Sequence, residues 1–248
     1  MDYIDDRIPL TRSQKYNLEE PIDELIEWHK KKELPKYIDF INNMKQTQLL
    51  DADIAFVNSV PNATERAFKQ LGKEAVVVLT PHIQILTDKQ VDAFMEDRQE
   101  RVDDYMEEKV SLSDEERREE WKEKQVDRWE QWLGDLTDKQ LSLFEALSLK
   151  WEYDLDAQSD AQNQITKALQ QALMQRENRK VLEASLMTLI DDYQSFYPEK
   201  YSAMLSRNQN RYAETVLAMF LDSTPEQQEH FEETSQDWIE RFENWQSL

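Results

Sequence analysis

The sequence predicts an all-α fold of about eight or nine helices in one elongated, mostly antiparallel array. Apolar residues recur with helical spacing along almost all of the 248 residues. Only two glycines, Gly72 and Gly134, are present, whereas sheets joined by tight turns need glycine at positive φ. A third observation is a local code for helix starts, in which Thr or Ser is followed three residues later by Gln or Glu.

The apolar stripes divide the chain into successive helices. Each stripe repeats mainly at steps of three or four residues, and in chain order they run over Leu18–His29, Leu34–Ile41, Val91–Met106, Trp121–Leu133, Tyr201–Phe220 and Phe231–Trp245. Between the fourth and fifth stripes we expect one long helix from about Asp156 to Phe196. Only Ala75–Leu79 resembles a strand, and a lone strand would have no partner.

Five capping boxes mark helix starts. In each, the Thr or Ser hydroxyl accepts a hydrogen bond from the backbone N–H of the third helical residue, and the Gln or Glu side chain of that residue accepts one from the backbone N–H of the Thr or Ser. The five pairs are Thr11 with Gln14, Thr87 with Gln90, Ser113 with Glu116, Thr137 with Gln140, and Thr224 with Gln227. The pentapeptide LTDKQ contains two of them, at residues 86–90 and 136–140. We interpret it as a helix start, and Gly134 as the residue that ends the preceding helix.

Domain organisation is predicted to be simple. No linker rich in Pro, Gly or Ser divides the chain, so we expect one domain over residues 1–248, with sub-units 1–155 and 156–248. An apolar content of 39% with seven Trp indicates a folded chain despite the net charge of −22.

Composition excludes several classes of function. A charge of −22 repels nucleic acid and anionic lipid, so we expect no nucleic-acid partner. Two glycines cannot form a nucleotide-binding loop, and without cysteine there is no thiolate metal site. The N-terminus MDYIDDRIPL contains no secretory signal, and no apolar run is long enough for a membrane span.

Residues that could do chemistry are few. The chain has three histidines, His29, His82 and His230, and His29 with Glu33 and His230 with Glu226 form pairs four residues apart. Two ligands without a third rarely make a metal site. We therefore expect no catalytic residue, no metal and no cofactor.

The most distinctive stretch is ELIEWHKKKELPKYIDFI, residues 24–41. Trp28, His29, Leu34, Pro35 and Tyr37 cluster there beside the one basic island, Lys30–Lys32. We favour a packed corner of the core over a ligand pocket, because aromatic residues at helical spacing usually indicate burial.

The N-terminal stretch, together with ERAFKQLGKEAVVVLTPHIQILTDKQ and RREEWKEKQVDRWEQWLGDLTDKQ, resembles a family of uncharacterised bacterial lipoproteins over about Tyr3 to Asp156. That resemblance implies a periplasmic or outer-membrane-associated protein of a Gram-negative bacterium. Its membrane attachment would be a lipid anchor absent from this chain. A second resemblance, at the level of the LTxxQ motif alone, is to the Spy-type periplasmic chaperones.

Three hypotheses of function follow. The first is a non-enzymatic, acidic, envelope-facing binding protein, chaperone-like towards unfolded or partner proteins. The second is a structural or scaffolding lipoprotein domain that docks one specific folded partner. The third is a metal-binding or catalytic protein that uses the region of His29 and Glu33. The candidate interaction residues are Thr11, Gln14, Trp28, His29, Leu34, Pro35, Tyr37, Thr87, Gln90, Thr137 and Gln140, and the oligomeric state is left open.

Overall fold

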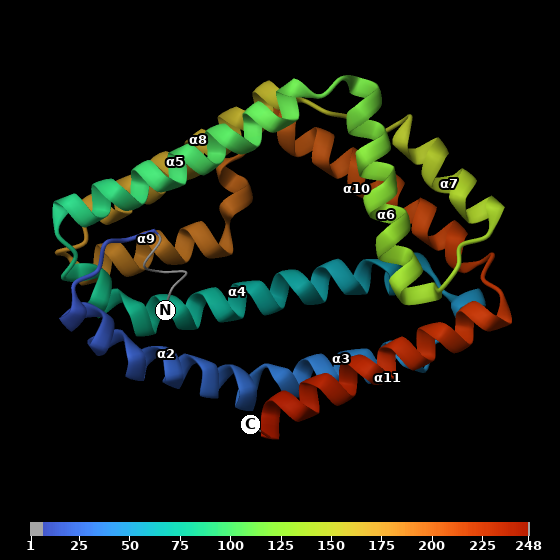
Figure 1. Ribbon diagram of the computed structural model, residues 1–248, viewed down its shortest axis with the longest axis horizontal. Coiled ribbons are helices and arrows are strands. Elements are labelled where there is room, and N and C mark those ends of the chain that lie inside the picture. Colours follow the sequence, from blue (N-terminus) through green and yellow to red (C-terminus); the bar gives the residue numbers. More distant parts are fainter. Residues whose placement is uncertain (1–6, 248) are drawn as a thin grey trace. The chain divides into compact units, whose positions relative to one another are not determined.

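A computed structural model describes residues 7–247, and within them the chain is helical without strands, so the all-α prediction is confirmed. Figure 1 shows the helices in chain order. They are α2 (Arg12–Lys32), α3 (Leu34–Lys45), α4 (Ile54–Gln84), α5 (Asp88–Ser111), α6 (Asp114–Leu133), α7 (Asp138–Ser148), α8 (Leu155–Met174), α9 (Arg179–Asp191), α10 (Glu199–Phe220) and α11 (Pro225–Ser247), with the 3-10 turns η1 (Leu49–Asp51) and η2 (Tyr193–Phe196). The first residues of the stretch that carries the lipoprotein resemblance, 3–6, lie outside the described part.

The structure settles two local expectations from the sequence. The apolar run Ala75–Leu79 lies inside α4, so it is helical. The single long helix expected from Asp156 to Phe196 is wrong, because α8 ends at Met174 and α9 begins at Arg179. The turn between them has no apolar side chain to bury, and the side chain of Asn178 accepts from Val181 N at 3.4 Å as the cap of α9.

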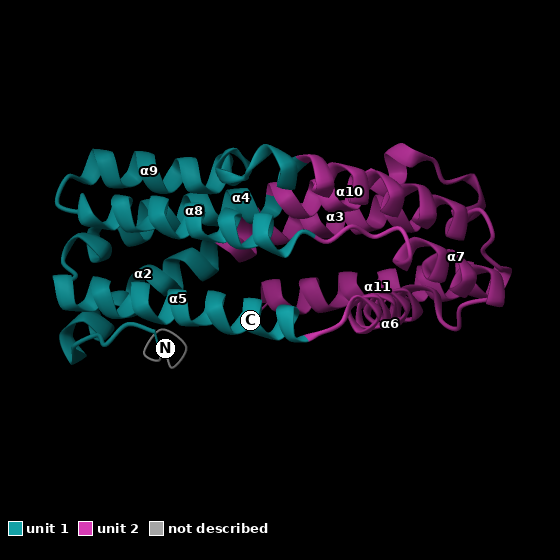
Figure 2. Ribbon diagram, turned by 90° about the horizontal axis from the view of Figure 1, so that it is seen from above, with its two compact units in different colours: residues 1–28, 67–111, 154–202 teal, residues 29–66, 112–153, 203–248 magenta. Residues whose placement is uncertain are grey.

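The described chain forms two compact units, each assembled from three segments (Figure 2). Unit 1 comprises Met1–Trp28, Ala67–Ser111 and Asp154–Ser202, and unit 2 comprises His29–Arg66, Leu112–Tyr153 and Ala203–Leu248. Helices α2, α4 and α10 each contribute residues to both units. The expected single domain with sub-units 1–155 and 156–248 stays a prediction, because compactness does not report independent folding.

Unit 2 has one continuous apolar core. Its largest fully buried side chains are Phe144 on α7 and Phe231 on α11, and they belong to a cluster with Leu49, Leu133, Val216, Met219 and Phe220. Side chains from α6, α7, α10 and α11 meet in this cluster. In addition, α3 packs along α11, and the two helices lie side by side in Figure 1.

Unit 1 has two smaller cores. Val76 of α4 packs with Ala172, Leu182 and Leu186 of α8 and α9. Val91 and Met95 of α5 pack with Leu173 of α8. At Gly72 a Cβ atom would come within 3.1 Å of the Ile190 side chain, which explains a glycine inside α4. Fewer apolar residues are buried here than in unit 2, so we expect unit 1 to be the less stable of the two.

Candidate functional site

The five capping boxes form as predicted. Thr137 Oγ1 accepts from Gln140 N at 3.2 Å, and Gln140 Oε1 accepts from Thr137 N at 2.9 Å. The boxes that begin with Thr11, Thr87, Ser113 and Thr224 have the same reciprocal bonds. The repeated pentapeptide therefore starts α5 and α7, as its spacing indicated.

Two of these boxes meet in unit 2 and form what we call the unit 2 clasp, the side chains of Gln140 and Gln227. Each glutamine donates from Nε2 to Oε1 of the other, at 2.9 and 2.8 Å. The remaining amide hydrogens go to backbone oxygens, from Gln140 to Met219 O and from Gln227 to Asp135 O. All four amide hydrogens are thus used, which suits a site where Gln140 is fully buried.

Unit 1 contains the corresponding pair, the unit 1 clasp of Gln14 and Gln90. Gln90 Nε2 donates to Gln14 Oε1 at 2.8 Å, and Gln14 Nε2 donates to Gln90 Oε1 at 3.2 Å. Gln90 also donates to Pro9 O at 2.9 Å, two residues before the capping Thr11, just as Gln227 bonds two residues before Thr137. The clasps were missed at the sequence level. The signal that could have revealed them is that a capping box uses only the side-chain oxygen of its glutamine. The two hydrogens of the side-chain NH2 group then need acceptors elsewhere in the fold.

An open hollow lies beside the unit 1 clasp, with a volume of about 530 Å³. Pro9 and Ile85 contribute its apolar wall, and the other lining residues, among them Ser13, Asn17 and Lys89, are polar. Ile85 belongs to the turn between α4 and α5, which is held against the end of α8 by a bond from Arg176 Nε to Leu86 O at 2.9 Å. The motif residues Thr11, Gln14, Thr87 and Gln90 also line this hollow.

Large apolar side chains are exposed at this end of unit 1. Ile85 is 55% exposed, and Met174, the last residue of α8, is 72% exposed. Tyr16 is 73% exposed and lies on the same turn of α2 as Ser13 and Asn17. The hollow is therefore accompanied by apolar groups that water, not protein, covers.

The distinctive corner predicted around residues 28–37 lies where α2 ends and α3 begins. Leu34 is buried, and Pro35 occupies the first turn of α3, where its missing N–H costs nothing. The rings of His29 and Tyr37 lie 5.6 Å apart, and Tyr37 contacts Phe242 of α11 at 5.9 Å. Trp28 is half-buried and is the last residue of the first segment of unit 1.

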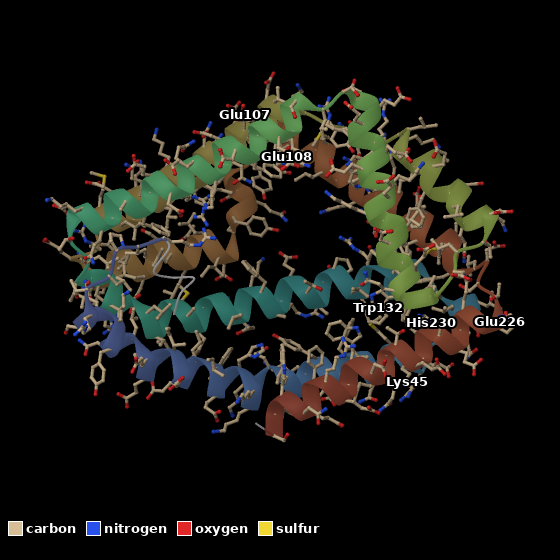
Figure 3. The ribbon with its side chains drawn as sticks, viewed as in Figure 1. Lys45, Glu107, Glu108, Trp132, Glu226 and His230 are labelled. Carbon is tan, nitrogen blue, oxygen red and sulfur yellow. The ribbon has the colours of Figure 1, made fainter. Side chains whose placement is uncertain are left out.

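Polar groups of this corner are already used within the fold. The buried carboxylate of Glu33 pairs with Lys36 Nζ at 2.6 Å, which leaves it poorly placed to hold a metal with His29. Burial lowers the pKa of His29, against the opposing effect of Glu33. His230 packs against Gly134, whose φ of 70° puts it in the left-handed region, and Glu226 lies one turn earlier on α11 (Figure 3). Across residues 7–247 no group of three or more His, Asp or Glu could hold a metal ion.

A second aromatic group lies in unit 2. Trp121 of α6 stacks on Trp151 at 4.3 Å, and Tyr212 of α10 approaches both rings edge-on. Tyr212 accepts from Trp129 Nε1 at 3.1 Å and donates to Gln125 at 3.2 Å. Because the two tryptophans fill the space between them, this group is packing and not an open cage.

Next to it, the carboxylate of Glu152 binds two guanidinium groups. Arg207 donates to both of its oxygens, and Arg211 donates to Oε1 at 2.5 Å. The hydrogen bonds from Arg207 and then Arg211 lower the pKa of Glu152 from 4.5 to about 2. These bonds tie the segment after α7 to α10.

We expect the Glu152 carboxyl to titrate near pH 2 in a carbon-detected NMR titration. A lowered pKa in the folded state means that the stabilisation is present above pH 4.5 and is lost as the pH falls towards 2. In the variant Arg207→Ala the pKa of Glu152 should rise, whereas Arg241→Ala, which changes an arginine of the same unit away from Glu152, should leave it in place. A Glu152 carboxyl that titrates at its ordinary pKa in the unmodified protein would contradict this prediction.

Helix content and net charge define the class as an acidic, all-α protein. The chain belongs to a family of unknown function, DUF6279, whose model matches residues 2–202. No curated protein and no solved structure matches it. None of the helices along residues 7–247 is long and apolar enough to cross a membrane.

Proposed function

We propose that this chain is a non-enzymatic binding protein of the cell envelope that holds apolar segments of unfolded or partner proteins. The observation that carries the proposal is the hollow of unit 1, with exposed Ile85 and Met174 at the same end. An apolar side chain of a partner that enters it leaves water without displacing any structural element. The envelope location is supported by the resemblance to bacterial lipoproteins.

Net charge supports a holding role. With 52 acidic and 30 basic residues, the chain repels further copies of itself while its exposed apolar groups remain available. A protein that carries an unfolded client must stay soluble with that client bound. The hollow is also open, so a segment could bind and leave without local unfolding.

The test is suppression of light scattering by reduced, aggregating α-lactalbumin at several-fold molar excess of the chain. We expect protection, and we expect Ile85→Ser to raise the concentration needed for half-protection about tenfold, since burying such a side chain contributes about 1.5–3 kcal/mol. Leu221→Ser is the matched control, because Leu221 is similarly exposed but belongs to unit 2 and does not line the hollow.

Absence of protection by the unmodified chain would sink the chaperone-like proposal. Equal loss of protection in both variants would show that the hollow is not where the client binds. The second candidate, a scaffold for one folded partner, is favoured instead if protection is absent while crosslinking in cells through residue 85 recovers a single protein.

A further inference from the structure

One edge of α11 contacts α6 in the first half of the helix and extends beyond that contact in the second half. In the first half of α11 this edge is covered: His230 Nε2 and Thr234 Oγ1 both lie 3.4 Å from Gln131 O, near the end of α6. Trp132 of α6 also contacts Phe231, with ring centroids 6.1 Å apart. Figure 3 shows Trp132 and His230 together at this crossing.

Beyond the crossing, the same edge of α11 stays exposed within the described residues of unit 2. Residues four, seven and eleven positions after Thr234 are Trp238, Arg241 and Trp245, which by helical geometry lie in line with it. Trp238 is 36% exposed and Trp245 is 56% exposed. We call these three residues the tryptophan edge. Ile239 is buried and Phe242 contacts Tyr37 of α3, so the neighbouring face of α11 is covered.

The tryptophan edge is ordered by its own contacts. The guanidinium of Arg241 lies over the Trp238 ring at 5.1 Å from its centroid, and Phe242 contacts both tryptophans, at 5.7 and 6.2 Å. Tryptophans held in this way lose little side-chain entropy on binding, which is the property of interface hot spots.

Charge on the two flanks of the edge is unequal. On one flank lie Glu233, Asp237 and Glu240, all exposed, and among residues 7–247 no Lys, Arg or His comes within ion-pair distance of them. On the other flank Gln246 donates to Lys30 O at 3.2 Å, which brings the end of α2 with its lysines alongside. A cationic partner would therefore be attracted over the acidic flank of α11.

We propose that the tryptophan edge is a docking surface for a basic amphipathic helix of another protein. Its apolar face would cover Trp238 and Trp245, whose spacing of seven residues matches two turns of a helix laid along α11. Its Lys or Arg side chains would reach Glu233, Asp237 and Glu240 and could stack on the exposed face of Trp245. This inference goes beyond the proposed function, since it concerns unit 2 and a folded ligand.

The experiment uses the full chain and two fluorescein-labelled 18-residue model helices that share one apolar face of Leu and differ only in having Lys or Glu elsewhere. We expect saturable binding of the Lys helix, weakened by salt, and no binding of the Glu helix. Trp245→Ser should weaken the Lys helix about tenfold or more. Asp237→Asn combined with Glu240→Gln should weaken it less and remove most of the salt dependence. Circular dichroism confirms that each variant is folded.

Asn244→Ser, an exposed change on the same turn of α11, is the matched control and should bind as the unmodified chain does. Equal binding of the Lys and Glu helices, or binding unaffected by Trp245→Ser, would overturn the proposal. So would sedimentation showing a dimer that Trp245→Ser dissociates, which would assign the edge to a second copy, or Trp245-dependent binding to anionic phosphatidylglycerol vesicles. The client assay that tests the hollow depends on Ile85 and not on Trp245, so the two proposals fail independently.

Discussion

The variant Gln140→Ala is expected to lose about 2 to 3 kcal/mol of the free energy of unfolding. Removal of the side chain takes away one arm of the capping box of α7, the bond from Thr137 N to Gln140 Oε1, whereas the Thr137 hydroxyl still accepts from the backbone amide of residue 140. The lost bond contributes about 0.5–1.5 kcal/mol. It also leaves one Nε2 hydrogen of the buried Gln227 without a partner, at about 1–3 kcal/mol for a buried group left unpaired. Met219 O loses one bond but still accepts from Asp222 N and Ser223 Oγ. Urea unfolding followed by circular dichroism measures the loss.

Two variants serve as comparisons for Gln140→Ala. Gln209→Ala, at an exposed position of α10, should change the free energy of unfolding by less than about 0.5 kcal/mol. Gln90→Ala changes the same residue of the other LTDKQ copy and should cost about 1–2 kcal/mol, because water in the adjoining hollow can bind the groups left behind. Equal losses from Gln140→Ala and Gln209→Ala would contradict the importance of the unit 2 clasp.

A double-mutant cycle separates the clasp from the two capping boxes. If Gln140 and Gln227 stabilise each other, their single variants should together lose more free energy of unfolding than the double variant does. We expect the losses from Gln140→Ala and Gln227→Ala to sum to about 0.5–3 kcal/mol more than the loss from the double variant. Additive losses would show that each glutamine serves only its own helix.

Phe144→Ala is expected to destabilise the protein by about 3–5 kcal/mol. Phe144 has no exposed surface and lies in the core of unit 2 among side chains from α6, α10 and α11. Neighbours fixed on separate helices cannot move together to fill the space, so most of the cavity should remain. The midpoint of urea unfolding should fall while its slope stays the same.

Leu149→Ala is the matched control for Phe144→Ala. Leu149 follows the same helix but is 63% exposed, so its truncation should cost less than about 1 kcal/mol. A loss from Phe144→Ala as small as that of the control would mean that unit 2 is loosely packed in solution.

Much of the fold was predictable from local patterns. A capping box involves residues three apart, and an apolar stripe involves residues on successive turns. Both can therefore be recognised in the sequence without knowledge of any distant contact. The break between α8 and α9 was not foreseen, because apolar residues resume at Val181 and Leu182 after the polar run 175–180 and only Asn178, as a cap, marks the start of α9. Similarly, α4 was seen only as a short apolar run, since Val76 and Thr80 bury one face while the opposite face remains apolar and partly exposed.

The candidate sites were predictable only in part. Thr11, Gln14, Thr87 and Gln90 were identified as a motif, and the structure brings all four to one hollow. The tryptophan edge was not identified, because Trp238 and Trp245 continue the apolar stripe that Phe231 begins. A buried tryptophan and an exposed one look the same in the sequence. Exposure depends on where α6 ends relative to α11, which is a tertiary property.

By itself the sequence determined that this protein is helical, acidic and without nucleotide-binding loops, and it determined where five helices begin, because each of these properties resides in composition or in neighbours a few residues apart. Tertiary structure alone decided which capping boxes meet, across 76 residues in unit 1 and 87 in unit 2. It also decided which apolar side chains stay in water. Both outcomes depend on how helices distant in the chain pack, and no local pattern specifies that packing.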